Sequence, residues 1–163
     1  MHIVIHALVE ASTEEEAVDA GKTVFDQLVG VDPYATPVFD YYVCFDEDET
    51  TVAGSARWGD LPTAAPVDAP EGQELLERGW TATEEQFERN LERVKDALDE
   101  LSDAEIMANV DLARHAFHQV GAYEGPTVFL YDEFRNGIRH RGRLDGILEE
   151  SEELWIVPAD VHF

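Results

Sequence analysis

A run of basic residues near the C-terminal end is the part of this sequence best suited to bind an anion. The chain carries a formal charge of -25, yet four of its eleven Lys and Arg residues fall between Arg135 and Arg143, with no acid among them. Guanidinium groups bind carboxylates and phosphates through planar pairs of N–H donors. The charge pattern therefore makes this stretch a candidate site for an anionic ligand or for an acidic partner surface.

The same stretch contains the strongest short hairpin signal of the chain, Asn136-Gly137. It predicts a strand over 127–135 that turns back into a second strand over 138–142. With a two-residue turn, the facing pairs are Arg135 with Ile138, Phe134 with Arg139, Glu133 with His140, and Asp132 with Arg141. Opposite charges facing each other across the ladder would stabilise the hairpin internally. Two interpretations stay open, internal charge pairing or a binding site, and the candidate residues for the second are Arg135, Arg139, His140, Arg141 and Arg143.

A second constellation with chemical potential is Asp111, His115 and His118, which are spaced as i, i+4 and i+7 on one side of a predicted helix. Imidazole and carboxylate groups at such spacing can gather around a metal ion. The three residues lie off the predicted buried stripe, and no HExxH pattern accompanies them. We therefore weigh a metal site against solvated surface residues and favour the surface residues, with no cofactor expected.

The remaining histidines and the one cysteine belong to predicted strands. His2 and His6 share a face of the first strand, and His6 could meet His162 if the first and last strands pair. Satisfied histidines within a sheet are the favoured interpretation. Cys44 lies mid-strand between apolar neighbours, and a single cysteine excludes an intramolecular disulfide and a CxxC redox pair.

The N-terminal elements are predicted from hydrophobic periodicity. Residues 2–9 are apolar on both faces, which is typical of a strand covered on both sides. A capping box at Thr13–Glu16 starts a helix that ends near residue 29. Residues 38–45 and 50–58 are predicted as a strand hairpin.

The C-terminal elements are predicted in the same way. A Pro- and Gly-rich stretch over 60–79 is expected to be a loop that packs on the surface or gates a pocket, with a short helix near Glu74-Leu75-Leu76 as one option. A second capping box at Thr83 starts an amphipathic helix, and another helix begins after Ser102. Residues 145–150 are expected to form a short helix. The chain ends in a buried strand over 154–163, in which Pro158 favours an edge position or a bulge.

Together these elements predict a single globular domain, 1–163, of the α+β class. Its sheet would be mixed but mostly antiparallel and covered by amphipathic helices, with a ferredoxin-like arrangement as one candidate. The stretch from Gly125-Pro126 to Asn136-Gly137 resembles the final hairpin of thioredoxin-like folds. Because the CxxC motif of that family is missing, the resemblance implies no redox activity.

The composition restricts the functional classes. Asp and Glu total 36, whereas lysine occurs only as Lys22 and Lys95, a balance that resembles cytoplasmic proteins of salt-accumulating halophilic archaea. So negative a chain is repelled by nucleic acid, and molar salt weakens phosphate contacts further. No apolar run is long enough to span a membrane. We expect a cytoplasmic, non-catalytic module that self-associates or binds a protein partner. The alternative is a small enzyme or anionic-ligand binder that uses Arg139, Arg141 and a histidine.

The acid excess also predicts how the folded state responds to salt. Repulsion among exposed carboxylates opposes compaction in dilute buffer, and it is screened when the Debye length falls to about 3 Å near 1 M salt. We expect the circular dichroism signal and the cooperative melting transition to be lost on dialysis from molar KCl into dilute buffer. An unchanged melting temperature across that range would contradict the prediction.

Overall fold

The computed structural model describes residues 1–31, 36–45, 52–99, 102–108, 111, 114, 128–151 and 153–163. The order of the elements along the chain is β1 (His2–Glu10), α1 (Glu14–Leu28), β2 (Tyr41–Cys44), α2 (Ser55–Trp58), β3 (Ala65–Pro66), α3 (Pro70–Asp99), α4 (Asp103–Ala108), β4 (Leu130–Tyr131), α6 (Arg141–Glu150) and β5 (Leu154–His162). The α+β class is therefore confirmed.

One mixed sheet organises these elements. Its strand order is β2-β5-β1-β4, and β3 pairs with the opposite end of β5. Among the neighbouring strands that the structure describes, only β1 and β4 run parallel; β5 is antiparallel to β1, β2 and β3. The unit β1-α1-β2 is thus a split βαβ with β5 inserted between its two strands. A ferredoxin-like sheet would need an antiparallel strand where β4 lies, so the likeness stops at this unit.

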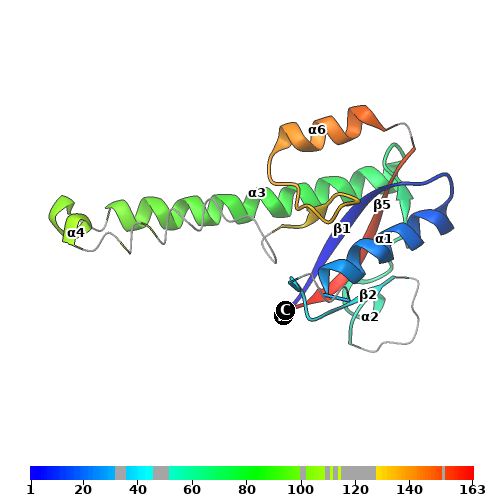
Figure 1. Ribbon diagram of the computed structural model, residues 1–163, viewed down its shortest axis with the longest axis horizontal. Coiled ribbons are helices and arrows are strands. Elements are labelled where there is room, and N and C mark those ends of the chain that lie inside the picture. Colours follow the sequence, from blue (N-terminus) through cyan, green and yellow to red (C-terminus); the bar gives the residue numbers. More distant parts are fainter. Residues whose placement is uncertain are drawn as a thin grey trace.

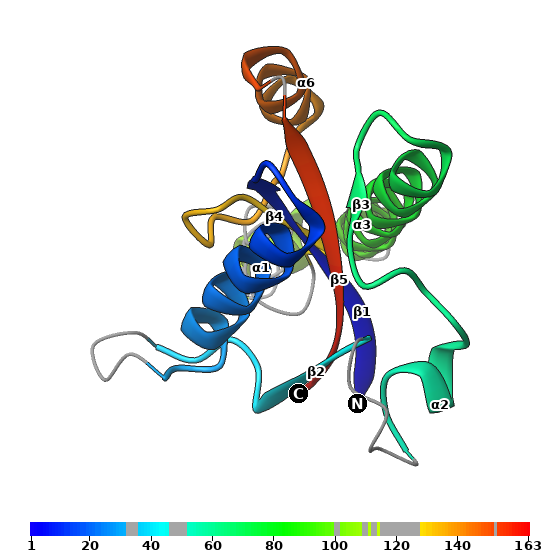
Figure 2. The ribbon, with the colours of Figure 1, turned by 90° about the vertical axis from the view of Figure 1, so that its right-hand side faces the viewer.

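The two faces of β1 support separate hydrophobic clusters, as the sequence predicts. Ile5, Ala7 and Val9 pack with α1, and alternate residues of β5 join them. Leu8 on the opposite face packs with Leu75 of α3, with Leu144 of α6 and with Ile156 of β5. Figure 2 shows α1 and α3 on opposite sides of the sheet. A strand buried on both faces explains why β1 is a nearly continuous apolar run.

The start of α1 also agrees with the sequence prediction. The Thr13 hydroxyl accepts a hydrogen bond from the Glu16 N–H at 3.2 Å. The helix ends before Gly30, whose φ of 77° is the left-handed conformation that favours glycine there.

Helix α3 differs most from the sequence prediction. It begins at Pro70 and runs unbroken to Asp99, so half of the predicted loop over 60–79 is helical. Figure 1 shows α3 as one long helix that passes α6 and extends beyond the sheet. The predicted capping residue, Thr83, is buried within α3 and donates its hydroxyl hydrogen to the Gly79 carbonyl at 3.0 Å.

Two glycines in α3 explain why the loop prediction was wrong. A Cβ on Gly72 would lie 2.0 Å from the Pro66 carbonyl oxygen, and one on Gly79 would lie 2.7 Å from the Leu130 side chain. Glycine weakens an isolated helix, but here it allows the helix to pack closely on β3 and β4. Tertiary packing therefore outweighs the local signal.

The predicted hairpin partner of β2 is also absent in the described residues. Residues 55–58 form the single helical turn α2, which follows Gly54 with its φ of 56°. Gly54 donates its backbone N–H to the buried carboxylate of Asp160 at 2.8 Å. This contact anchors the segment beside β5 rather than in the sheet.

Pro158 lies in an interior strand, which corrects the expectation of an edge or bulge. The carbonyls of Leu154 and His162 accept hydrogen bonds from the β3 and β2 sides. Alternate residues of a strand point their polar groups the same way, so position 158 also faces that side. There β3 pairs with residues 155–156 and β2 with 159–162. Pro158 has no N–H to donate, and its position on β5 faces the gap between the short strands β3 and β2.

The glycine contacts predict opposite effects for two alanine substitutions. Gly72→Ala should lower the free energy of unfolding by about 2–3 kcal/mol, because the new methyl group overlaps the Pro66 backbone. Gly146→Ala in α6 is the matched control: apart from the backbone of its own helix, no atom of the described residues lies within 4 Å of its Cβ position. It should stabilise by up to about 1 kcal/mol. Denaturant titration in molar KCl would measure both, and equal effects would contradict this packing.

Candidate functional site

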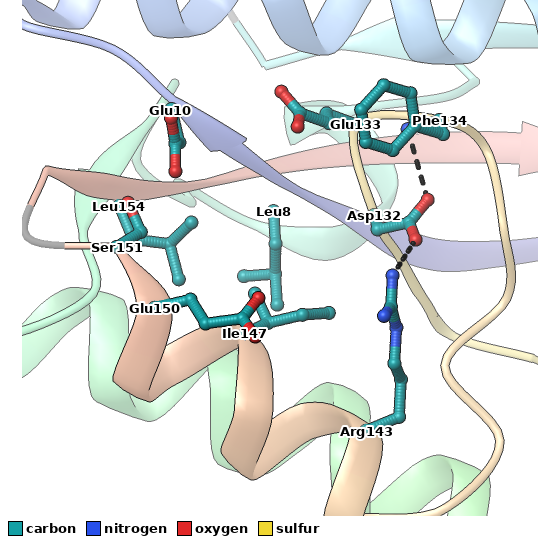
Figure 3. A pocket seen from close by; sticks show the side chains of 10 residues that line it. All are labelled: Leu8, Glu10, Asp132, Glu133, Phe134, Arg143, Ile147, Glu150, Ser151 and Leu154. Atoms are coloured by element: carbon teal, nitrogen blue, oxygen red, sulfur yellow. Dashed lines mark hydrogen bonds and ion pairs between the residues drawn. The ribbon is translucent and has the colours of Figure 1, made fainter.

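The basic stretch is organised around one buried carboxylate. Asp132 is 4% exposed and accepts hydrogen bonds from the backbone N–H of Phe134 at 3.0 Å and of Asn136 at 2.8 Å. It also accepts from the Asn136 amide at 3.1 Å and from the Arg143 guanidinium at 2.9 Å. Figure 3 shows Arg143 reaching from α6 to this carboxylate. Asp132 thus ties the turn to the first part of α6.

The predicted two-residue hairpin turn is wrong. The last pair across the loop is Tyr131 with Gly137, which form an antiparallel bridge, and not Arg135 with Ile138. The Ile138 N–H then donates to the Leu130 carbonyl at 2.8 Å. The reversal therefore includes residues 132–136, with Arg135 in the left-handed region at φ 60°. The Asp132 carboxylate stabilises this wider loop by accepting two of its backbone N–H groups.

The predicted return strand over 138–142 is also wrong, because α6 begins within it. His140 is the N-cap, and its Nδ1 accepts the Arg143 N–H at 3.1 Å. Arg141 bonds Asp145 through Nε at 2.8 Å, one helical turn later. The predicted cross-strand pairs are thus replaced by Arg143 with Asp132 and Arg141 with Asp145. The expected short helix over 145–150 is the second half of α6.

The helix α6 presents its two arginines to different hollows. Arg143 borders a cavity of about 110 Å³ between α6, the end of β1 and the Asp132 loop. The floor is apolar, with Leu8, Ile147 and Leu154, while Glu10, Glu133 and Glu150 lie around the opening (Figure 3). The one cation here is already paired with Asp132, so this cavity does not favour an anion.

Arg141 borders a larger groove of about 580 Å³ between α6 and α3. Its guanidinium lies 5.7 Å from the centre of the Trp80 ring, within cation–π range. Leu76 and Leu148 add apolar surface, and Glu77 and Glu84 of α3 add negative charge. The groove therefore combines an aromatic ring, aliphatic surface and both signs of charge.

The other three basic candidates do not converge on either hollow. Arg135, Arg139 and His140 are exposed, and none of them lines the cavity or the groove. Burial raises the pKa of Tyr131 above its ordinary range, and the positive charge of Arg139 opposes that shift.

The predicted metal constellation is only partly described. Asp111 is exposed in a helical position, and His115 and His118 lie outside the described residues. Within the described ranges, no three His, Cys, Asp or Glu side chains are grouped so that they could hold a metal ion. Cys44 is buried in β2 and, as the single cysteine of the chain, forms no intramolecular disulfide.

The first and last strands do pair, but they bring different histidines together than predicted. The register places His2 opposite His162, and His6 opposite Pro158. His6 is 1% exposed, and its Nδ1 lies 3.3 Å from the Phe129 carbonyl. Its Nε2 has no hydrogen-bond partner among the described residues. Burial lowers the pKa of His6 to about 4; the Phe129 carbonyl raises it in part and the charge of Arg78 lowers it.

Sequence reasoning missed the α3 wall of the groove. Its signal was present: Leu76 and Trp80 are one helical turn apart, and Gln73, Glu77, Thr81 and Glu84 follow the same face. The prolines and glycines of 60–79 obscured this periodicity. Asp160, an acid within the apolar final strand, is a second sequence signal for a functional residue, and the structure buries its side chain.

Comparison with known proteins gives one match. Residues 1–163 match the model of a protein family described as Domain of unknown function (DUF7995). Neither a curated protein nor a solved structure matches the chain. In the described part of the chain, no helix has the length and apolar character that crossing a membrane requires.

The lowered pKa of His6 predicts a pH dependence of stability. The unfolded imidazole takes up a proton near pH 6.5, whereas the folded one does so only near pH 4. Stability should therefore fall as the pH drops from about 6.5 towards 4, by up to about 3 kcal/mol.

The matched variant for this prediction is His6→Leu, which has no titrating group at that position. In denaturant titrations at molar KCl, the free energy of unfolding of the wild type should decrease relative to that of His6→Leu as the pH falls. The other histidines and the carboxylates are common to both proteins. A difference that stays constant from pH 7 to pH 4.5 would contradict the burial of a neutral His6.

Proposed function

We propose that this chain, which belongs to the family described as Domain of unknown function (DUF7995), is a cytoplasmic, salt-adapted module that binds a second copy of itself. The observation that carries the proposal is the groove between α3 and α6, where Arg141 lies over the Trp80 ring. Trp and Arg are the side chains that most often contribute strongly to the affinity of protein interfaces.

The groove has the size and surface for inserted side chains of a partner. Its volume of about 580 Å³ is open to solvent along two helices rather than closed around a small ligand. Trp80, Leu76 and Leu148 are half-buried, so part of their apolar surface is still accessible. Covering that surface supplies the favourable free energy of association.

The charges of the groove favour a second copy as the occupant. One wall carries Glu77 and Glu84, and Arg141 lies across from them. In a two-fold dimer the same patch of both copies forms the interface, so residue i of one copy contacts residue j of the other and the reverse. A patch that carries both positive and negative charges can therefore be complementary to itself. Arg141 of one copy would then approach Glu77 or Glu84 of the other, while Trp80 and the two leucines pack at the centre.

The Arg141–Asp145 pair does not prevent this contact. Both side chains are about half exposed, at 58% and 48%, and an exposed i,i+4 pair contributes little to stability. Arg141 bonds Asp145 through Nε, so its two terminal amino groups are available for further donation. Of the five basic candidates, Arg141 is therefore the one that we assign to the partner contact.

High salt is the condition in which such self-association is expected. Two copies that each carry a formal charge of -25 repel each other at long range. Near 1 M salt the Debye length is about 3 Å, so this repulsion is screened while contacts between touching groups persist. The absence of an intramolecular disulfide, which follows from the single cysteine Cys44, also suits the reducing cytoplasm.

The proposal predicts a charge-dependent dimer. Arg141→Glu should weaken dimerisation at least ~10-fold in molar KCl, because it places like charges at both contacts. Adding Glu77→Arg and Glu84→Arg to the same chain should restore the affinity, since each contact again joins opposite charges. Sedimentation velocity over a concentration series would give the dissociation constants.

A matched control makes the same charge changes on α3 outside the groove. Arg89→Glu, alone and combined with Glu88→Arg and Glu92→Arg, alters exposed residues that do not line the groove. These variants should dimerise like the wild type. The proposal is wrong if the wild type stays monomeric at all concentrations, or if Arg141→Glu is no weaker than Arg89→Glu.

A further inference from the structure

The ends of β1, β2 and β5 bring together a tyrosine, a histidine and a buried aspartate. His2 Nδ1 lies 2.9 Å from Oδ1 of Asp160, and His2 Nε2 lies 3.3 Å from the Tyr41 hydroxyl. Asp160 is 0% exposed, whereas Tyr41 is 43% exposed. The three groups thus lead from the interior of the sheet to its surface. No residue of this cluster lines the α3/α6 groove.

The contacts of Asp160 determine which nitrogen of His2 carries the proton. Its second oxygen, Oδ2, accepts the Gly54 N–H at 2.8 Å, which stabilises the charged carboxylate. A carboxylate only accepts, so Nδ1 of His2 is the donor and carries the hydrogen. Nε2 is then the basic lone pair, and it accepts the hydrogen bond from the Tyr41 hydroxyl.

We propose that Tyr41 is a nucleophilic site, activated by His2 and positioned by Asp160, that accepts acyl groups from uncharged carboxylic esters. A nucleophile bonded to a base, which a third group orients, is the arrangement that activates hydroxyl groups for covalent chemistry. An exposed phenol on the same surface as a basic lone pair meets this requirement.

The acyl transfer step balances without any other reactant. The Tyr41 oxygen attacks the carbonyl carbon of the ester, and a new carbon–oxygen bond forms as the bond to the alcohol breaks. The phenol proton passes to Nε2 of His2 and then to the departing alcohol oxygen. Asp160 stays ionised and stabilises the imidazolium that forms in between.

The neighbouring groups explain why the ester should be uncharged. The His162 ring stacks on Tyr41, with centroids 5.1 Å apart and planes at 9°, and packs edge-on against His2 at 5.0 Å. His162 Nδ1 donates to the exposed Asp40 carboxylate at 3.0 Å, and its Nε2 lies 3.2 Å from the Met1 amino nitrogen. Asp40 and the acidic surface of the protein repel a phosphorylated or carboxylated reagent.

The next residue along the chain is a built-in control. Tyr42 points to the opposite face of β2 and donates its hydroxyl hydrogen to Asp26 at 2.8 Å. A carboxylate is a much weaker base than a neutral imidazole. Tyr42 therefore shares the sequence context of Tyr41 but not its activation.

The test uses p-nitrophenyl acetate with the full chain in molar KCl, followed by peptide mapping of the acetylated residues. We expect Tyr41 to be acetylated at least ~10-fold faster than Tyr42, because general-base assistance contributes on the order of 10²-fold or more. Comparable rates at the two tyrosines would overturn the proposal, and this readout needs no variant.

Two variants separate the base from the nucleophile. His2→Gln should lower the rate at Tyr41 at least ~10-fold, and Tyr41→Phe should remove the acetylated peptide. Added imidazole should restore part of the rate in His2→Gln but leave Tyr41→Phe inert. Circular dichroism would check that both variants remain folded. An unchanged rate in folded His2→Gln would refute the role of His2.

Discussion

The pairing between the first and the last strand is the interaction on which the rest of the structure depends. Nine residues of β1 face nine residues of β5, from His2 opposite His162 to Glu10 opposite Leu154. The outer side of β5 then carries β2 and β3, so the sheet is built around its last strand. Contacts between residues so far apart in sequence close a long loop, which makes this ladder the entropically costly step of folding.

Both proposed sites follow from this ladder. Helix α6 directly precedes β5, so the position of β5 holds α6 beside α3 and forms the groove that Arg141 and Trp80 line. At the opposite end, the register buries Asp160 beside His2 and brings β2 close enough for Tyr41 to reach the same imidazole. One pairing thus positions the chemistry at both ends of the sheet.

The sequence predicted the elements whose signals are local and agree with their packing. The two-faced β1, the capped α1 and the apolar β5 were predicted because burial and periodicity coincide there. Predictions failed where a tertiary contact reverses a local preference. Gly72 and Gly79 are compatible with helix α3 only because β3 and β4 lie close to them. Asn136-Gly137 does not form a tight turn because the Asp132 carboxylate holds a wider loop.

The candidate site was predictable only in part, for the same reason. The local excess of positive charge includes Arg141, which borders the groove. Its partner across the groove, Trp80, lies on α3, in a segment whose glycines and prolines predict a loop. The cluster around His2 depends on the register of the first and last strands, which places His2 beside Asp160, 158 positions away in the chain, and no local pattern specifies that register.

The central claim, self-association through the α3/α6 groove, is tested most directly by a distance measured across the dimer. Thr81 is exposed and lines the groove, and the native Cys44 is buried, so a spin label would attach selectively to a Thr81→Cys chain. Double electron–electron resonance in molar KCl should show one defined distance between the two labels. The modulation depth should fall when Arg141→Glu is added, because the dimer population falls. A modulation depth unchanged by Arg141→Glu, or a broad distribution of distances in a dimeric sample, would contradict association through the groove.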